Sequence, residues 1–303
     1  MARYIGLGDY YDEAWAIAVD SNDNIYVTGL SYGSDTDRDY ATIKYSPDSN
    51  QPVWVARYNG PGNSTDWPHA ITVDSNDNIY VTGKSVGSVT QYDYATIKYS
   101  SDSNQPIWVA RYNGPGNNFD GARAITADSN DDIYVVGLST GAGTGYDYDY
   151  ATVKYSPDSN QHIWVARYNG GSANAIAVDS NDNIYVTGHS YGADTHQDYA
   201  TIKYSPDSNQ PVWVVRYNGP GNFEDYAYAV AVDSNDNIYV TGNSYGSGTD
   251  YDYATIKYSP DFTCTPPVIG DFDHDCDVDI YDLRTFCQHW LECNLDPPEA
   301  CWE

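Results

Sequence analysis

Five near-copies of one unit of about 54 residues fill most of this chain, and the two ends of the repeat are offset from each other. The phrase VDSNDNIYVTG begins at Val19 and recurs, with small changes, at Val73, Ala127, Val178 and Val232. The last copy stops at Asp261 and lacks the closing segment WVARYNG, whose core instead stands at residues 2–4. A unit that lacks its final strand at one end, with a spare strand at the other, predicts a closed ring of repeats.

Each unit contains four short segments with the alternation of a β-strand. In the second copy they are residues 70–73, 78–85, 93–99 and 107–112, separated by turn sequences such as DSND and NGPGN. Four antiparallel strands at a period of 40 to 50 residues are typical of a propeller blade. The sequence therefore predicts an all-β fold, a five-bladed β-propeller over residues 1–262, closed by the N-terminal strand Ala2-Arg3-Tyr4.

The repeated phrases identify a family resemblance. D-x-x-x-N-I-Y-V-T-G, then D-Y-A-T-I-K-Y-S-P-D, then W-V-A-R-Y resembles the bacterial SBBP β-propeller repeat over residues 2–261. That family is named for seven blades, whereas this chain carries five copies of the unit. The resemblance implies a secreted or surface protein and no single activity.

The charge of the chain argues against nucleic acid as a partner. The net charge is −29, and ten of the 14 lysine and arginine residues recur at fixed positions of the repeat, where an ion pair with a repeated Asp is expected. Repulsion from phosphates opposes nucleic-acid binding. The sequence has no apolar run long enough to span a membrane, so membrane insertion is not expected. It also shows no signal peptide, so either a leader has been removed or the gene start is misplaced, and an intracellular location is the less favoured alternative.

The segment after the repeats reads as a linker, residues 263–270, and a small acidic module, residues 271–303. Acidic side chains stand at positions 1, 3, 5, 7, 9 and 12 of a loop, the spacing that wraps oxygens around Ca²⁺. These predicted calcium ligands are Asp271, Asp273, Asp275, Asp277, Asp279 and Asp282. Apolar residues from Leu283 to Leu291 then recur at helical spacing, which predicts an amphipathic helix.

This loop and helix resemble one half of a type I dockerin, an EF-hand-type calcium module. The resemblance implies attachment to a cohesin-like partner, although dockerins carry two such repeats and only residues 271–292 match here. All five cysteines, 264, 276, 287, 293 and 301, lie in the tail, which indicates an oxidising, extracellular setting with one cysteine left over. Their pairing is open, with Cys264 or Cys301 as the better partners for Cys276 and Cys293.

Three repeated motifs have both a functional and a structural interpretation. Gly-x-Ser-x-Gly, from Gly29 in the first blade, suggests a hydrolase nucleophile, but five identical copies without a following helix favour a hairpin. Asp20, Asn22 and Asn24 resemble the start of a calcium loop, yet an Asx turn is favoured. Another Asp precedes the inner strand of four blades (Asp12, Asp66, Asp120 and Asp225), where it either binds turn amides or holds a cation at the channel mouth.

Residues that differ between blades are the better candidates for ligand contact, because the shared fold does not dictate them. They are Trp15, Trp67, Phe119 and Tyr226 in one set, and Asp37, Arg38, Gln91, Tyr146, His196 and Gln197 in another.

The sequence thus favours a secreted, non-catalytic binding or display protein, expected to be a monomer. The blade rim would bind a glycan or protein, and the calcium-ordered tail would attach the chain to an extracellular or cell-surface partner. The alternative is a dockerin-bearing enzyme or accessory component of polysaccharide breakdown. No pair of carboxylates outside the repeated positions stands out as a glycosidase pair, so catalysis is not expected.

Overall fold

A computed structural model describes residues 2–7, 11–33, 37–142, 148–192, 196–260 and 262 of the 303. Within these ranges the chain forms 19 β-strands and no helix, which confirms the all-β prediction. No described segment is therefore a helix with the length and apolarity needed to cross a bilayer.

The strands form five antiparallel sheets in chain order, and each sheet is one copy of the repeat. The first blade contains β1 (Asp12–Val19), β2 (Ile25–Tyr32), β3 (Arg38–Tyr45) and β4 (Pro52–Tyr58). The second contains β5 (Asp66–Val73), β6 (Ile79–Val86), β7 (Tyr92–Tyr99) and β8 (Pro106–Tyr112). The third contains β9 (Asp120–Ala127), β10 (Ile133–Thr140), β11 (Tyr148–Tyr155) and β12 (His162–Tyr168). The fourth contains β13 (Gly171–Val178), β14 (Ile184–Tyr191), β15 (Gln197–Tyr204) and β16 (Pro211–Tyr217). The fifth contains β17 (Asp225–Val232), β18 (Ile238–Tyr245) and β19 (Tyr251–Tyr258).

Neighbouring blades pack face to face, and the apolar core lies between them. Each of the four junctions between consecutive blades holds its own cluster of buried side chains. At the first junction, Tyr26 and Tyr40 of one blade pack with Ile79, Val81 and Ile97 of the next, all of which are buried. Successive side chains of a strand point to opposite faces, and because a neighbouring blade covers each face of an internal blade, large side chains point to both neighbours.

The DSND turns form a polar staple between consecutive blades. In each turn the last Asp adopts a left-handed backbone, as at Asp77 with φ of 59°. The Asp77 carboxylate accepts hydrogen bonds from the Ser21 amide (2.9 Å), the Ser21 hydroxyl (2.8 Å) and the Asn22 amide group (2.8 Å). The same staple recurs at Asp131, Asp182 and Asp236.

A second set of repeated hydrogen bonds links the outer parts of the blades. Tyr94 donates to the carbonyl of Ala151 in the next blade (3.2 Å), and Lys98 and Trp108 both donate to the carbonyl of Pro157 (2.9 and 3.1 Å). These bonds satisfy polar groups that the packing would otherwise bury without partners. The repeat-locked lysines are thus structural.

The repeat-locked arginines are also structural, as the sequence predicts. Arg111 bonds the Ser85 hydroxyl and carbonyl (both 2.7 Å), the Asp93 carboxylate (2.8 Å) and, in the preceding blade, the Tyr58 hydroxyl (2.9 Å). The equivalent arginines Arg57, Arg167 and Arg216 pair with Asp39, Asp149 and Asp198.

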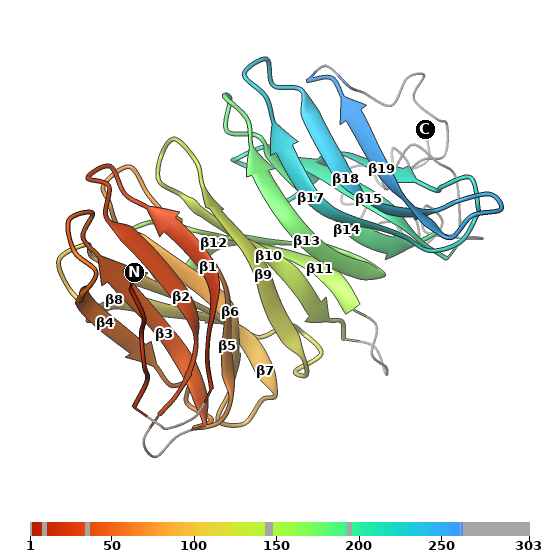
Figure 1. The fold of residues 1–303 in the computed structure, drawn as a ribbon. Helices are drawn as coiled ribbons and strands as arrows, with labels where there is room; N and C mark the ends of the chain where they lie inside the picture. The colour runs from red at the N-terminus through yellow and green to blue at the C-terminus, as the bar shows by residue number, and fades with distance from the viewer. Residues whose placement is uncertain are drawn as a thin grey trace, which may run out of the picture.

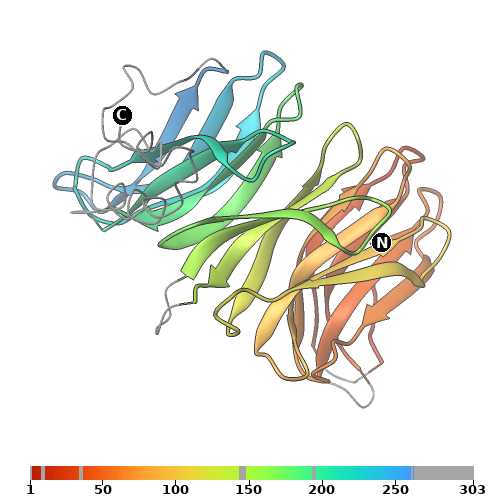
Figure 2. The ribbon, with the colours of Figure 1, turned by 180° about the vertical axis from the view of Figure 1, so that it is seen from behind.

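The five blades follow one another in an arc whose first and last blades lie at opposite ends (Figures 1 and 2). Contacts between inner strands join β1 to β5, β5 to β9, β9 to β13 and β13 to β17. The fifth sheet has three strands, and residues 2–4 do not form its fourth. They lie instead against the first blade, where Arg57 donates to the Tyr4 hydroxyl (3.3 Å) just as Arg111 does to Tyr58. Tyr4 therefore occupies the position that the outer strand of a preceding blade would fill.

Candidate ligand-binding site at the bulged inner strands

Every inner strand contains a β-bulge at the same position of the repeat. In the first blade the pairing passes from Ala14 opposite Gly29 to Ala16 opposite Thr28, which leaves Trp15 without a cross-strand partner. The same step occurs in the other four blades. The unpaired residues, which we call the bulge row, are Trp15, His69, Arg123, Asn174 and Tyr228. Bulges redirect one side chain and are common beside functional sites.

The glycine that opens each Gly-x-Ser-x-Gly motif makes the bulge possible. A Cβ atom on Gly137 would lie 2.1 Å from the carbonyl oxygen of Gly121, and the glycines of the other blades are equally crowded. The first four residues of the motif therefore belong to the second strand, and only its last glycine lies in the predicted hairpin, where the Gly33 amide donates to the Asp37 carbonyl (3.3 Å). Its serine is structural as well, because Ser139 accepts a hydrogen bond from Arg167 (2.6 Å). A nucleophile elbow needs a strand that turns into a helix, and no described residue is helical.

Members of the bulge row contact one another from blade to blade. The Trp15 ring meets the His69 ring edge to face at 5.4 Å. Arg123 donates a hydrogen bond to the side-chain oxygen of Asn174, whose own amide group donates to the Ala227 carbonyl (2.7 Å). The rings of Trp15 and Tyr228, at the two ends of the row, are 44 % and 56 % exposed. The row thus places five different side chains on neighbouring inner strands, with side-chain contacts from the first blade to the second and from the third blade to the fourth.

Aromatic rings flank this row. Trp67 packs edge to face on Trp15, with ring centroids 5.9 Å apart. Lys84 lies 5.2 Å from the ring centroids of Trp67, Tyr92 and Phe119, within the range of cation–π attraction. At the other end of the row, the Tyr226 ring stacks nearly parallel to the Tyr228 ring at 6.4 Å.

The two histidines near the row are neutral at physiological pH. Burial lowers the pKa of His69 to about 4, and the nearby charges of Lys84 and Arg123 act in the same direction. Burial also lowers the pKa of His189 to about 4, with a smaller effect from Arg123. A neutral imidazole carries one donor and one acceptor. Both histidines can therefore take part in hydrogen bonds to uncharged hydroxyl groups.

The sequence found this site only in part. Trp67 and Tyr226 lie two residues before the bulge, inside β5 and β17, and not in loops. Phe119 immediately precedes β9, Arg38 and Gln197 begin β3 and β15, and Tyr146 lies outside the described residues. His69, Arg123, Asn174 and Tyr228 were missed. The signal was present, since each bulge residue stands four positions before the start of the VDSND phrase, one of the places where all five copies carry a different residue.

The Asp residues at the start of the inner strands bind turn amides. This is one of the two roles expected from the sequence, the other being a cation site at the channel mouth. Asp66 is buried and accepts hydrogen bonds from the amides of Gly60 (2.6 Å) and Val86 (3.1 Å). Asp120 and Asp225 make the same bonds in their blades. Burial raises the pKa of Asp66 and Asp120, and these amides oppose that rise.

The DSND segments are Asx turns, as the sequence favoured. The Asp20 carboxylate accepts hydrogen bonds from the amides of Asn22 and Asn24 (both 2.9 Å) and from the Tyr26 hydroxyl (2.8 Å). These bonds occupy its oxygens within the turn, a pattern typical of Asx turns.

The acidic tail residues lie outside the described part of the chain. This applies to the linker at 263–270 and to Asp271, Asp273, Asp275, Asp277, Asp279 and Asp282, so the calcium loop stays a prediction. Within the described ranges, no group of three or more His, Cys, Asp or Glu side chains is placed to hold a metal ion.

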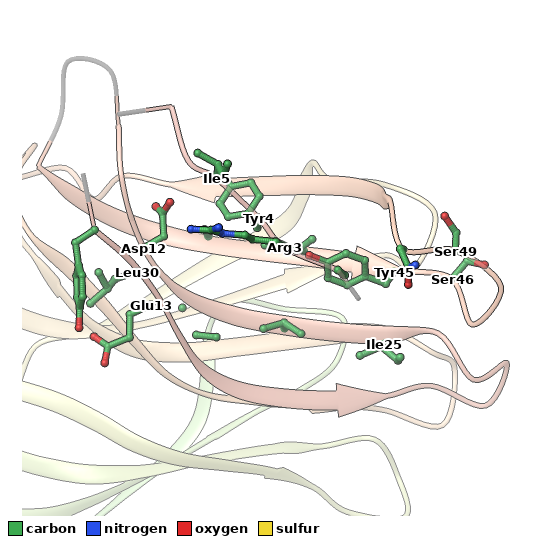
Figure 3. A pocket seen from close by; sticks show the side chains of 18 of the residues that line it. Arg3, Tyr4, Ile5, Asp12, Glu13, Ile25, Leu30, Tyr45, Ser46 and Ser49 are labelled. Carbon is green, nitrogen blue, oxygen red and sulfur yellow. The ribbon is translucent and has the colours of Figure 1, made fainter. Parts of the chain in front are cut away.

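A pocket of about 920 Å³ opens on the outer face of the first blade (Figure 3). Its walls include Ile25, Ile43 and Tyr45, with Arg3, Tyr4 and Ile5 lying across it. The equivalents of its apolar walls in the second blade, Ile79, Ile97 and Tyr99, are fully covered by the first blade. We therefore interpret this pocket as an uncovered blade face and not as a ligand site.

Comparisons with known proteins agree with this architecture. Residues 2–35, 53–88, 163–194 and 212–248 match the SBBP family model, described as a beta-propeller repeat. None of the curated proteins compared with the chain matches it. Among solved structures, a protein of unknown function from Dyadobacter fermentans DSM 18053 is similar at a TM-score of 0.50 and 7% identity, over 83% of this chain and 81% of that one. At that identity the likeness concerns the fold alone. The chain is therefore a repeat protein that matches the SBBP β-propeller repeat over these four segments.

Proposed function

We propose that this chain is a secreted, non-catalytic binding protein whose ligand contacts the bulge row. The observation that carries the proposal is the chemical variety of this row beside nearly constant residues of the unit. Five equivalent positions carry five chemically different side chains, while the neighbouring alanines, the glycine and the serine stay nearly constant. Because the bulge leaves these side chains outside the cross-strand pairing, the fold does not restrict them, and recognition is the role that such positions can take.

The expected ligand is a glycan or another extracellular polymer. Exposed Trp and Tyr rings provide flat apolar faces, and Asn174 and the neutral His69 provide hydrogen bonds to hydroxyl groups. Paired carboxylates of a glycosidase are a different arrangement, and the repeated Asp residues of the blades are engaged in turn amides and ion pairs.

Binding can be tested by affinity electrophoresis of the full-length protein in a panel of soluble polysaccharides. We expect at least one polysaccharide to retard the protein, and Trp15→Ala with Tyr228→Ala to abolish the retardation. Both side chains are about half exposed, so the variant is expected to fold. Val53→Ala with Ile107→Ala is the matched control, because these residues are 55 % and 54 % exposed on the outer strands. Equal retardation of the two variants would contradict a site on the bulge row.

The proposal includes closure of the five blades into a ring. The uncovered face of the first blade is the counterpart of the face that β17–β19 exposes, because every junction of the repeat uses the same two faces. In a closed ring, Arg3 would meet Asp252 as Arg111 meets Asp93. Residues 2–4 would then complete the fifth sheet.

Tyr253 reports on closure. Its side chain is 99 % exposed in the arc, whereas its equivalents Tyr40, Tyr94 and Tyr150 are completely buried between blades. We expect hydroxyl-radical footprinting with mass spectrometry to find Tyr253 as protected as Tyr94, with half-exposed Tyr191 as the reactive reference. Reaction of Tyr253 at the rate of Tyr191 would contradict closure. Protection that disappears on dilution would assign the contact to a second copy of the chain.

The tail is proposed as a calcium-ordered attachment to an extracellular or cell-surface partner, with a cohesin-like protein as one class of partner. Its support is the spacing of Asp271, Asp273, Asp275, Asp277, Asp279 and Asp282. Calcium titration of the full-length protein, followed by calorimetry, should give one site of stoichiometry one. The variant Asp273→Ala with Asp275→Ala should lose it.

The dockerin-like tail also favours a second candidate, an enzyme or accessory component of extracellular polysaccharide breakdown. Release of reducing ends from a polysaccharide that the protein binds would support this candidate. Binding without such release would leave the non-catalytic function as the better one.

A further inference from the structure

Of the four lysine and arginine residues outside the repeat-locked positions, the three that lie in the blades gather in one place. The blades contain three of them, Arg38, Lys84 and Arg123. Arg38 lies 5.2 Å from the Trp67 ring centroid, and Lys84 lies at the same distance on that ring. Arg123 belongs to the bulge row and is close enough to Lys84 to lower its pKa, after the larger effect of burial. Trp67 and His69 thus stand in the middle of three cations.

These three cations lack the carboxylate partners that the repeat-locked arginines have. Arg111 pairs with Asp93 at 2.8 Å, and its equivalents pair similarly. No described carboxylate lies within ion-pair distance of Arg38, Lys84 or Arg123. Asp37, next to Arg38 in sequence, instead accepts a hydrogen bond from Thr65 (2.7 Å). In a chain of net charge −29, three like charges on one strip, with no carboxylate partner among the described residues, are a costly arrangement unless an anion completes it.

The aromatic rings beside them do not neutralise these charges. Cation–π attraction holds Lys84 against three rings and leaves its full positive charge in place. Arg123 uses one of its nitrogens to bind Asn174, and the guanidinium has further N–H groups in a fork that matches a carboxylate. Arg123 is exposed and Lys84 is partly exposed, so both are within reach of a ligand.

We infer that the strip around Trp67 binds a saccharide that carries a carboxylate, with Arg123 and Lys84 on the carboxylate and Trp15 or Trp67 on the sugar ring. The inference rests on the proposed function and specifies its ligand class. The C–H groups of one sugar face are positively polarised and fit the negative face of an indole ring. The neutral His69 and Asn174 are placed for hydroxyl groups, which a bare inorganic anion does not have.

A nucleic acid fits the strip less well than an acidic saccharide. The blades alone carry a net charge near −20, which repels a polymer with one phosphate per nucleotide. A polyuronate has a charge density similar to that of a nucleic acid only when every sugar carries a carboxylate. Because the negatively charged blades repel dense negative charge, saccharides with fewer carboxylates are expected to bind best.

The test uses the full-length protein and pairs of oligosaccharides of equal length. Probes are tri- to hexasaccharides of galacturonate, of mannuronate and guluronate, and of alternating glucuronate and neutral sugar, each with its methyl-esterified counterpart. Calorimetry and quenching of tryptophan fluorescence measure affinity. At least one acidic probe should bind roughly 10-fold or more tighter than its ester, since charge-assisted hydrogen bonds are the stronger ones.

Variants separate the carboxylate contact from the sugar contact. Lys84→Met with Arg123→Met should weaken binding of the acidic probe roughly 10- to 100-fold and leave binding of the ester unchanged. Arg123→Lys, which keeps the charge, should restore part of the lost affinity. Gln51→Glu with Gln105→Glu, which lowers the net charge by the same two units at exposed positions just before β4 and β8, is the control for net charge and should change neither. The melting temperature of each variant is measured first, because lost folding would affect both probes equally.

Three results would overturn the inference. If an acidic probe and its ester bound with equal affinity, the strip would still be a glycan site and the proposed function would stand, but the site would make no contact with a carboxylate. Weakening by Gln51→Glu with Gln105→Glu as large as by Lys84→Met with Arg123→Met would reduce the effect to net charge. Failure of every saccharide probe, with polymers of another class retarding the protein, would reject the ligand class while the bulge row stays the binding site.

Discussion

Replacing Arg111 by methionine is expected to lower the free energy of unfolding by about 3 kcal/mol or more, the usual range for breaking a buried ion pair by removing one partner. Arg111 binds four acceptors on three segments, and its pair with Asp93 is largely covered, with side-chain exposures of 22 % and 6 %. The variant leaves the Asp93 carboxylate buried without a cation. Urea denaturation monitored by circular dichroism measures the loss.

Arg38→Met is the matched control for this prediction. Arg38 has the same side chain but one hydrogen bond, to the Tyr32 hydroxyl, and no carboxylate within ion-pair distance among the described residues. Its replacement should cost less than about 1 kcal/mol, the range of exposed charged contacts. Similar losses for Arg38 and Arg111 would show that the buried pair is not what holds the blades together.

Replacing Gly137 by alanine is expected to cost about 3 kcal/mol or more and to disturb the ligand site. The added Cβ would lie 2.1 Å from the Gly121 carbonyl oxygen and 2.9 Å from the Ala122 Cα, so the inner strand must move. Overpacking against side chains commonly costs about 1–3 kcal/mol, and backbone atoms yield less readily. Because these atoms flank the Arg123 bulge, binding of any ligand of the bulge row should weaken as well. Denaturation and calorimetry measure the two effects.

Gly121→Ala is the control within the same blade, one strand away. A Cβ at Gly121 would meet its nearest atom, of the Phe119 ring, at an ordinary contact distance of 3.4 Å. This variant should be neutral or stabilising by up to about 1 kcal/mol, because alanine restricts the unfolded chain. If both glycine variants lost the same stability, the close approach at Gly137 would not be the reason for glycine in the motif.

The blades were predictable because their signal is local and repeated. Alternation in β6, β7 and β8 gave the second, third and fourth strands of the unit within one residue of the structure. The inner strand was placed four residues too late, at Ala70 and not Asp66. The bulge at His69 adds one residue and so breaks the period of two that marks a strand. Proline and aspartate, the residue types at positions 68 and 66, are also rare in strands.

The candidate site was harder to predict, because its signal is neither local nor the same in each copy of the repeat. Trp15 and Trp67 share a residue type and were therefore grouped together in the sequence. The strand pairing shows that Trp15 and His69, at the bulge, occupy the same position of the repeat. Which cations face Trp67 depends on the packing of separate blades, a tertiary property that no single copy of the repeat contains. The position of residues 2–4 on the first blade is likewise set by contacts between distant parts of the chain.

The bulge has a consequence for how such a protein can change. It divides each unit into two groups of positions, one that packs in the apolar clusters between blades and one that lies outside these clusters. Substitutions in the second group alter surface chemistry and leave the apolar clusters intact, so new specificities can accumulate one blade at a time. The same separation suits engineering, because a library varied at residues 15, 69, 123, 174 and 228 alone would sample different surfaces on a single unchanged scaffold.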